Sequence, residues 1–354
     1  MNTAVDGLSP RLMSLLEHFR AGRVTALARA ISVVEDEREG FQGFLHSVLA
    51  TGPSARRVGF TGPPGAGKST LVAAAATSYR AHDEHIGVIA VDPTSPYSGG
   101  ALLGDRIRMN DLTLDPGIFI RSMATRGSLG GLATTSKEVL DLMDAFGFDR
   151  ILVETVGVGQ TELEITSAAD TVIVVLVPES GDAIQAMKAG LMEIADIFVV
   201  NKADRPGADR FVKELRQALH LRAGNAMKDI PSHHGVDLGR VMRQERTTDA
   251  KAPQEAGWSI PVISTVGQNG EGVPKLLEAV DAHRVWLEES GQLESRRRAR
   301  ARARVEDVVE RELRRVARGS DRARELLELS LDDIQRRAET PYSVARRILD
   351  ALLR

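Results

Sequence analysis

The chain has 354 residues, a net charge of -3, 42% hydrophobic and 27% charged residues, and no cysteine. This length predicts one large domain with appendages or two domains, and the small net charge gives no reason to expect nucleic acid or an acidic membrane as a partner. The absence of cysteine excludes disulfides and thiolate metal sites. The longest fully apolar run in the central region, residues 172–177, is too short to span a bilayer, and the N-terminus has no apolar signal core, so we expect a cytoplasmic protein.

Apolar residues recur at helical spacing near the N-terminus. They form three groups, at Leu12–Leu16, Val24–Ile31 and Phe41–Val48. The spacing predicts three short helices within an N-terminal extension over residues 1–50.

Short apolar runs alternate with helical stretches from Arg56 onward. The runs are continuous, as is typical of strands buried on both faces of a parallel sheet. They lie at residues 58–60, 86–91, 118–120, 151–153, 172–177, 197–200 and 260–263. The pattern predicts an α/β domain with a doubly wound, mostly parallel sheet over residues 51–290, in which residues 219–259 form an insertion or loop.

The strand pattern stops after Trp286, and residues 291–354 predict a C-terminal helical arm. Six of the nine residues from 296 to 304 are arginine, but no aromatic residue is interleaved to stack on bases, and acidic residues follow at once. This run therefore favours a solvated or partner-facing helix surface over nucleic-acid binding. Apolar residues at helical spacing, Gly319 and the Thr340-Pro341 pair predict three amphipathic helices. A dimer interface is the simplest use of their apolar faces, and docking on the parent domain is the alternative.

The central motif is a phosphate-binding loop that follows the first predicted strand and opens a helix. Residues 62–69 fit the pattern G-x-x-x-x-G-K-[ST] at every fixed position. Its consecutive N–H groups can point at phosphate oxygens, Lys68 can supply a charge for the terminal phosphates, and Ser69 can offer a hydroxyl to magnesium. The predicted nucleotide-binding residues here are Gly62, Pro63, Pro64, Gly65, Ala66, Gly67, Lys68, Ser69 and Thr70.

A second motif predicts which base is bound. Asn201-Lys202-Ala203-Asp204 directly follows the predicted strand 197–200 and fits N-K-x-D. The carboxylate of Asp204 can accept both donors on the guanine edge, which adenine lacks, and sites of this kind discriminate by roughly 10⁴ or more. We therefore expect GTP and GDP as ligands. Ser264, Thr265 and Val266 stand where a backbone contact to the guanine carbonyl is expected.

Two acidic residues end predicted strands at the same sheet edge as Ser69. They are Asp92 and Glu154, and one direct and one water-mediated contact to magnesium is expected because this ion keeps several waters. Glu154-Thr155-Val156-Gly157 occupies the place of the D-x-x-G motif of most GTPases, with glutamate as a distinctive departure.

With these residues in place, the chain resembles the MeaB family, within the glutamate-variant branch of P-loop GTPases and related to the human methylmalonic aciduria type A protein. The resemblance is carried by residues 62–70, 91–95, 99–105, 127–131, 151–160 and 201–204. It implies a homodimeric chaperone that uses GTP to gate the loading of adenosylcobalamin onto methylmalonyl-CoA mutase and to protect that enzyme, with the adenosyltransferase as a second candidate partner. Adenosylcobalamin itself belongs to the mutase. The resemblance also implies that the C-terminal arm mediates dimerisation.

The same resemblance implies roles for residues in three switches. Asp92 and Asp105 would lie near magnesium, residues 154–160 would form the second switch, and residues 178–188 would form a third switch that communicates with the mutase. Many GTPases place a glutamine after the second-switch glycine to orient water, but Val158 stands there in this chain. The expected catalytic residues are therefore Lys68 and Glu154, with Gln160, Gln185 and Lys188 as candidates to position water, and hydrolysis is expected to be slow without a partner.

Alternatives stay open at this point. A nickel metallochaperone GTPase is disfavoured by the lack of cysteine and of clustered histidines. A non-hydrolysing regulatory module would bind nucleotide without turnover, and a transport-linked kinase would require ATP, which Asp204 opposes. An isobutyryl-CoA-type mutase is an alternative partner.

Overall fold

The computed structural model describes residues 8–49, 55–92, 110–124, 134–155, 164–178, 190–225 and 257–352. At the ends of some of these ranges, including Asp92, only the backbone is described. The chain divides into two compact units, residues 1–293 and 294–354. None of the helices in the described ranges is long and apolar enough to cross a membrane.

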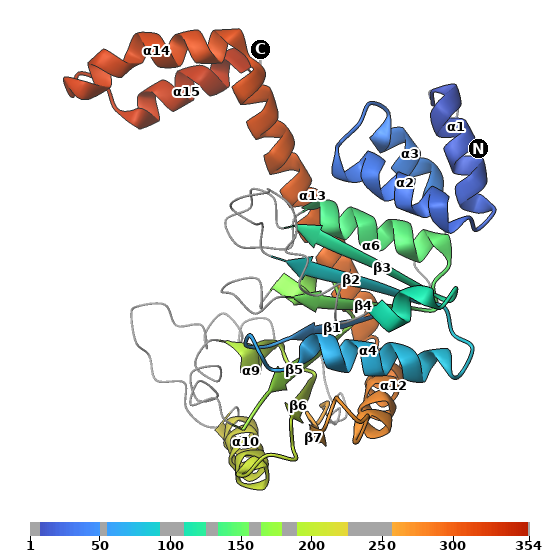
Figure 1. Ribbon diagram of the computed structural model, residues 1–354. Helices are drawn as coiled ribbons and strands as arrows, with labels where there is room; N and C mark the ends of the chain where they lie inside the picture. The colour runs from blue at the N-terminus through green and yellow to red at the C-terminus, as the bar shows by residue number, and fades with distance from the viewer. Residues whose placement is uncertain are drawn as a thin grey trace, which may run out of the picture. The chain divides into compact units, whose positions relative to one another are not determined.

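The larger unit is built on one seven-stranded parallel sheet (Figure 1). The strand order is β3-β2-β4-β1-β5-β6-β7. Strands β4, β2 and β3 therefore lie on one side of β1, and β5, β6 and β7 lie on the other. The strands are β1 (Arg56–Thr61), β2 (Ile86–Asp92), β3 (Ile118–Ala124), β4 (Arg150–Thr155), β5 (Thr171–Leu176), β6 (Ile197–Asn201) and β7 (Val262–Thr265). Each coincides with one of the seven predicted apolar runs, and the predicted doubly wound sheet is confirmed.

Helices cover both faces of this sheet. Apolar residues of α4 (Lys68–Arg80) and α12 (Val273–Glu289) form one core with the strands. The opposite core contains α6 (Thr134–Phe146), α10 (Ala208–Asn225) and the N-terminal helices. The shorter elements are the 3-10 helices η1 (Asn110–Leu114) and η2 (Ile165–Ser167) and the helix α9 (Leu191–Ile194).

The three predicted N-terminal helices are α1 (Pro10–Arg20), α2 (Val24–Glu35) and α3 (Phe41–Val48). They lie beside α6 (Figure 1). Ring packing between Phe19 of α1 and Phe146 of α6, with centroids 5.2 Å apart, joins them to the helical layer. The N-terminal extension thus shares a core with the sheet.

Two predicted boundaries were wrong. The last strand begins at Val262 rather than Ile260, because Pro261 has no N–H to donate and contributes only its carbonyl, which accepts a 2.9 Å hydrogen bond from the N–H of Phe198. The predicted loop over residues 219–259 begins too early, since α10 continues to Asn225. Residues 226–256 lie outside the described ranges.

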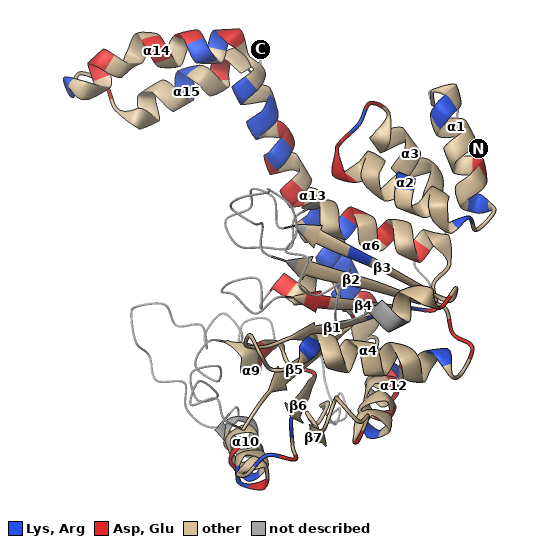
Figure 2. Cartoon of the chain, in the orientation of Figure 1, with Lys and Arg blue, Asp and Glu red and all other residues tan. Residues whose placement is uncertain are grey.

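The smaller unit consists of helices, as predicted. They are α13 (Gln292–Gly319), α14 (Asp321–Gln335) and α15 (Pro341–Leu352). The hydroxyl of Ser320 caps α14 by accepting a 3.2 Å hydrogen bond from the N–H of Ala323. Ala323 of α14 and Val344 of α15 are buried, whereas α13 contains no buried residue and carries charges of both signs along its length (Figure 2).

Candidate nucleotide-binding site

The predicted phosphate loop joins β1 to α4 at the carboxyl edge of the sheet. Gly67 is the N-cap of α4 in a left-handed conformation, with φ of 86°, and Gly62 has φ of 132°. A Cβ atom at Gly62 would overlap the carbonyl oxygen of Val175, and one at Gly67 would overlap the side-chain amide of Asn201. The loop therefore needs glycine at both positions, because its backbone presses against β5 and against the end of β6.

Lys68 is the first residue of α4 and is buried. Its Nζ donates to the carbonyl oxygens of Gly62, at 2.7 Å, and of Pro63, at 3.0 Å. The ammonium group is thereby held over the loop at a helix N-terminus, where the backbone dipole also favours an anion. This arrangement fits the predicted role of Lys68 as the charge for a terminal phosphate.

Ser69 and Glu154 lie at one sheet edge, as predicted, and the structure also places them in direct contact. The hydroxyl of Ser69 donates a 2.6 Å hydrogen bond to Oε1 of Glu154, whose side chain is only 2% exposed. The strand register explains the approach, because Glu154 of β4 stands beside Phe60 of β1, one residue before the strand leads into the loop. A hydroxyl and one carboxylate fit a magnesium ion, which takes few protein ligands and keeps several waters. No group of three or more histidine or acidic residues suited to a metal occurs in the described part of the chain.

The predicted guanine motif is tied to the phosphate loop. Asn201 is buried, and its amide nitrogen donates a 2.8 Å hydrogen bond to the carbonyl of Ala66. Lys202 adopts φ of 56°, and its Nζ donates to the carbonyl of Gly65 at 2.9 Å. Asp204 is exposed. The structure thus brings together the loop after β1 and the loop after β6.

The loop after β7 completes this arrangement. The side-chain oxygen of Asn201 accepts hydrogen bonds from the Thr265 hydroxyl, at 3.1 Å, and from the N–H of Gly267, at 3.0 Å. The carbonyl of Thr265 accepts from the N–H of Ala203 at 3.0 Å. Thr265 is therefore buried in support of the motif, while the neighbouring Ser264 is exposed and Val266 is half-buried. The contact of Gly267 with Asn201 was not predicted from the sequence. A glycine directly after the predicted residues 264–266 was the signal that could have indicated it.

The remaining predicted residues lie at the end of β2, around the phosphate loop or outside the described ranges. The backbone of Asp92 ends β2 beside β4, at the expected edge. Pro63 is half-buried, Pro64 exposed and Thr70 half-buried on the first turn of α4. The expectations for Asp105, Gln160, Gln185 and Lys188 fall outside the described ranges.

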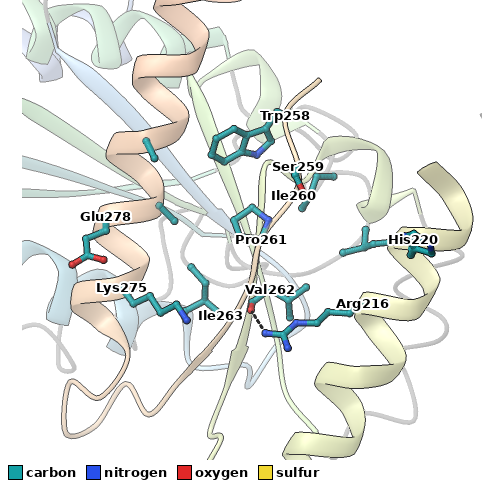
Figure 3. A pocket seen from close by; sticks show the side chains of 13 residues that line it. Arg216, His220, Trp258, Ser259, Ile260, Pro261, Val262, Ile263, Lys275 and Glu278 are labelled. Carbon is teal, nitrogen blue, oxygen red and sulfur yellow. Dashed lines mark hydrogen bonds between the residues drawn. The ribbon is translucent and has the colours of Figure 1, made fainter. Parts of the chain in front are cut away.

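A separate cavity of about 890 Å³ lies along the free edge of β7, between α10 and α12 (Figure 3). Arg216 and His220 reach it from α10, Lys275 and Glu278 from α12, and Trp258 closes one end (Figure 3). Arg216 Nη2 donates a 3.1 Å hydrogen bond to the carbonyl of Val262, which faces away from β6. None of the predicted nucleotide-binding residues lines this cavity.

The parallel sheet, the glycine loop that opens α4 and the N-K-x-D loop after β6 together define a P-loop GTPase. Within this class the chain belongs to the family described as "Methylmalonyl Co-A mutase-associated GTPase MeaB", whose family model matches residues 27–321. The resemblance seen in the sequence is confirmed.

Similar proteins agree with this assignment. The chain is 45% identical to a putative GTPase of Pyrococcus horikoshii, over 83% of this chain and 84% of that protein. It is 30% identical to the mitochondrial methylmalonic aciduria type A homolog of Mus musculus, over 98% of this chain and 81% of that protein. A crystal structure of a LAO/AO transport system kinase, 23% identical, shares the fold with a TM-score of 0.66 over 100% of this chain and 99% of that one. The protein is thus a GTPase that hydrolyses GTP to GDP and phosphate.

Proposed function

We propose that this GTPase is a chaperone of an adenosylcobalamin-dependent acyl-CoA mutase, in the first place methylmalonyl-CoA mutase, and that it gates cofactor loading and protects the mutase. The observation that carries the proposal is the family match over residues 27–321, whose description names association with that mutase. The mouse relative, named for methylmalonic aciduria, supports the same partner. An isobutyryl-CoA-type mutase is the alternative partner. The adenosyltransferase that serves the partner mutase is a further candidate partner.

In this proposal different residues bind the phosphates, the base and the magnesium ion. The N–H groups of the glycine loop and the Lys68 ammonium hold the phosphates, and the buried hydrogen bonds of Asn201 keep that loop in register with the base-binding loop. Asp204 accepts from guanine. Ser69 and Glu154 would hold magnesium, which supplies charge neutralisation at the phosphates when it is bound.

The proposed switches explain why hydrolysis would depend on a partner. The side chain of Val158 can neither donate to nor accept from water, so another side chain must position the attacking water. We assign this task to Gln160, Gln185 or Lys188, of which the last two lie in the segment proposed to communicate with the mutase. The proposal therefore expects slow turnover by the isolated GTPase and faster turnover on the mutase.

The C-terminal unit is the proposed dimer interface. Four apolar residues of α13, Val305, Val309, Leu313 and Val316, are each at least half exposed. Their spacing of four, four and three residues places them on one stripe of the helix, as in helix pairs that associate through such a seam. Pairing with the same stripe of a second chain would bury it.

The test is GTP turnover with and without purified methylmalonyl-CoA and isobutyryl-CoA mutases, combined with pull-downs in the presence of GDP or a non-hydrolysable GTP analogue. We expect one mutase to bind in a nucleotide-dependent way and to accelerate hydrolysis. The variants Gln185→Ala and Lys188→Ala should reduce this stimulation more than the basal rate, whereas the exposed Lys213→Ala on α10 is the matched control. Fast basal turnover that no mutase changes would contradict the proposal.

A further inference from the structure

A groove rich in arginine lies in the N-terminal helices, apart from the nucleotide site. It has a volume of about 960 Å³ and is lined by residues of α1, α2, the loop after α2 and β3. Its lining includes five arginines, from four separate segments: Arg11, Arg23, Arg29, Arg38 and Arg121. Glu39 is the single acidic residue among the lining residues. The groove therefore concentrates positive charge in a protein whose net charge is -3.

Three of these arginines are not neutralised. Arg121 is paired with Glu35, and Arg38 with Asp36 at 2.7 Å. Arg11, Arg23 and Arg29 form no ion pair with any carboxylate in the described ranges. The carboxylates of Asp36 and Glu35 are thus paired with the other two arginines, and three guanidinium groups with five donors each have no carboxylate partner within the described ranges.

Backbone N–H groups add to this positive charge. Arg23 is the N-cap of α2 and makes no side-chain capping bond, and no acidic residue occurs in the first turn of the helix. The first N–H groups of a helix have no partner inside the helix, and Thr25, which bears one of them, lines the groove. The positive end of the α2 dipole therefore reinforces the attraction of Arg23 for an anion.

The shape of the groove indicates the size of the ligand. The lining residues along α1 run from its N-cap Ser9 to His18, a span of about 13 Å along the helix. Leu12, Leu15 and Val33 provide apolar lining between the charged groups. The volume lies in the range of pockets for small molecules, and guanidinium groups match phosphates with paired hydrogen bonds.

We propose that this groove binds a small organic molecule that carries two or more phosphate groups, with its apolar part against α1 and its phosphates on Arg11, Arg23 and Arg29. The site is distinct from that of GTP. Arg121 belongs to the edge strand β3, and two strands, β2 and β4, separate β3 from β1 and its phosphate loop. No residue is shared between the two sites, so the groove can be filled while GTP or GDP is bound.

The experiment is titration calorimetry of the full chain with inorganic tripolyphosphate as the probe, after saturation with GDP and with magnesium in excess. We expect one additional binding event per chain. The double variant R23Q/R29Q should bind the probe at least about tenfold more weakly, because each lost guanidinium removes charge-assisted hydrogen bonds. R346Q, which removes an exposed arginine of α15, is the matched control and should bind like the wild type.

Two further measurements separate the outcomes. The thermal unfolding midpoint and GTP turnover of R23Q/R29Q should equal those of the wild type, since both side chains are exposed and outside the GTPase site. Equal weakening by R346Q, or no additional event after GDP saturation, would overturn the proposal. It would also be overturned by tighter, arginine-dependent binding of polyglutamate, because an acidic protein segment would then be the better ligand.

Discussion

The side-chain amide of Asn201, at the end of β6, donates a 2.8 Å hydrogen bond to the carbonyl of Ala66 within the phosphate loop. The oxygen of the same amide accepts from Thr265 and from the N–H of Gly267 after β7. One buried side chain thus joins the loops after β1, β6 and β7. The predicted base-binding motif is therefore also a structural support of the phosphate loop.

Replacement of Asn201 tests this support. In Asn201→Ala the carbonyl of Ala66 and the N–H of Gly267 lose their partner, and we expect a loss of about 2 kcal/mol in the free energy of unfolding. Urea denaturation without nucleotide measures it, and Gln268→Ala, on an exposed neighbour, is the control. Equal stability of both variants would show that the three loops do not depend on this amide.

Two glycines of the phosphate loop should respond differently to alanine. At Gly62 a Cβ would overlap the Val175 carbonyl, so Gly62→Ala must displace the loop from β5. At Gly65, with φ of 75°, nothing lies within 4 Å of the added Cβ, and the cost is backbone strain alone, about 1 kcal/mol. GTP affinity, followed with a fluorescent analogue, should fall much further for Gly62→Ala. Similar affinities would mean that the contact with β5 does not shape the loop.

Asp115 should make stability depend on pH. Hydrogen bonds from Arg80 Nε, at 3.1 Å, and from the N–H of Gly117, at 2.8 Å, hold the pKa of Asp115 below its ordinary value of 3.8. Since the folded-state pKa is lowered, the contact stabilises the protein above the ordinary value, and this gain is lost as the pH falls through the folded-state pKa.

We therefore expect Asp115→Asn to lower the thermal unfolding midpoint near neutral pH, with the difference from wild type shrinking in acid. Asp83→Asn is the control, because Asp83 faces the same Arg80 at 3.7 Å but is 99% exposed. A deficit of Asp115→Asn that stays constant into acid would contradict the assigned role of the charge.

The apolar stripe of α13 is expected to hold two chains together. Leu313→Asp places a charge on a residue that is 56% exposed, so the single chain should fold normally while association is lost. Light scattering should report a dimer for the wild type and for Glu310→Gln, and a monomer for Leu313→Asp and for a chain that ends near residue 290. A dimer that persists in both altered proteins would place the interface elsewhere.

The sequence predicted most of this fold because its strands are buried on both faces. All seven continuous apolar runs correspond to strands. Only the start of the last strand differs from the prediction, at Val262 instead of Ile260, because Pro261 lacks an N–H. The phosphate loop and the position of Glu154 at the same sheet edge as Ser69 were also predictable, since both follow from where the strands end. The hydrogen bonds of Asn201 to Ala66 and Gly267 were not, because they join segments up to 135 residues apart that local pattern does not relate. The arginine groove was missed for the same reason.

The most direct test of the account compares turnover of GTP, ATP and xanthosine triphosphate by the wild type and by Asp204→Asn. The wild type should hydrolyse GTP, and its kcat/KM for ATP should be lower by roughly 10⁴, because adenine offers no donor to the carboxylate of Asp204. Asp204→Asn should lose efficiency with GTP and gain it with xanthosine triphosphate, since donor and acceptor on that edge exchange. Comparable kcat/KM values for GTP and ATP in the wild type, or a variant that keeps the original preference, would contradict the assignment of this site.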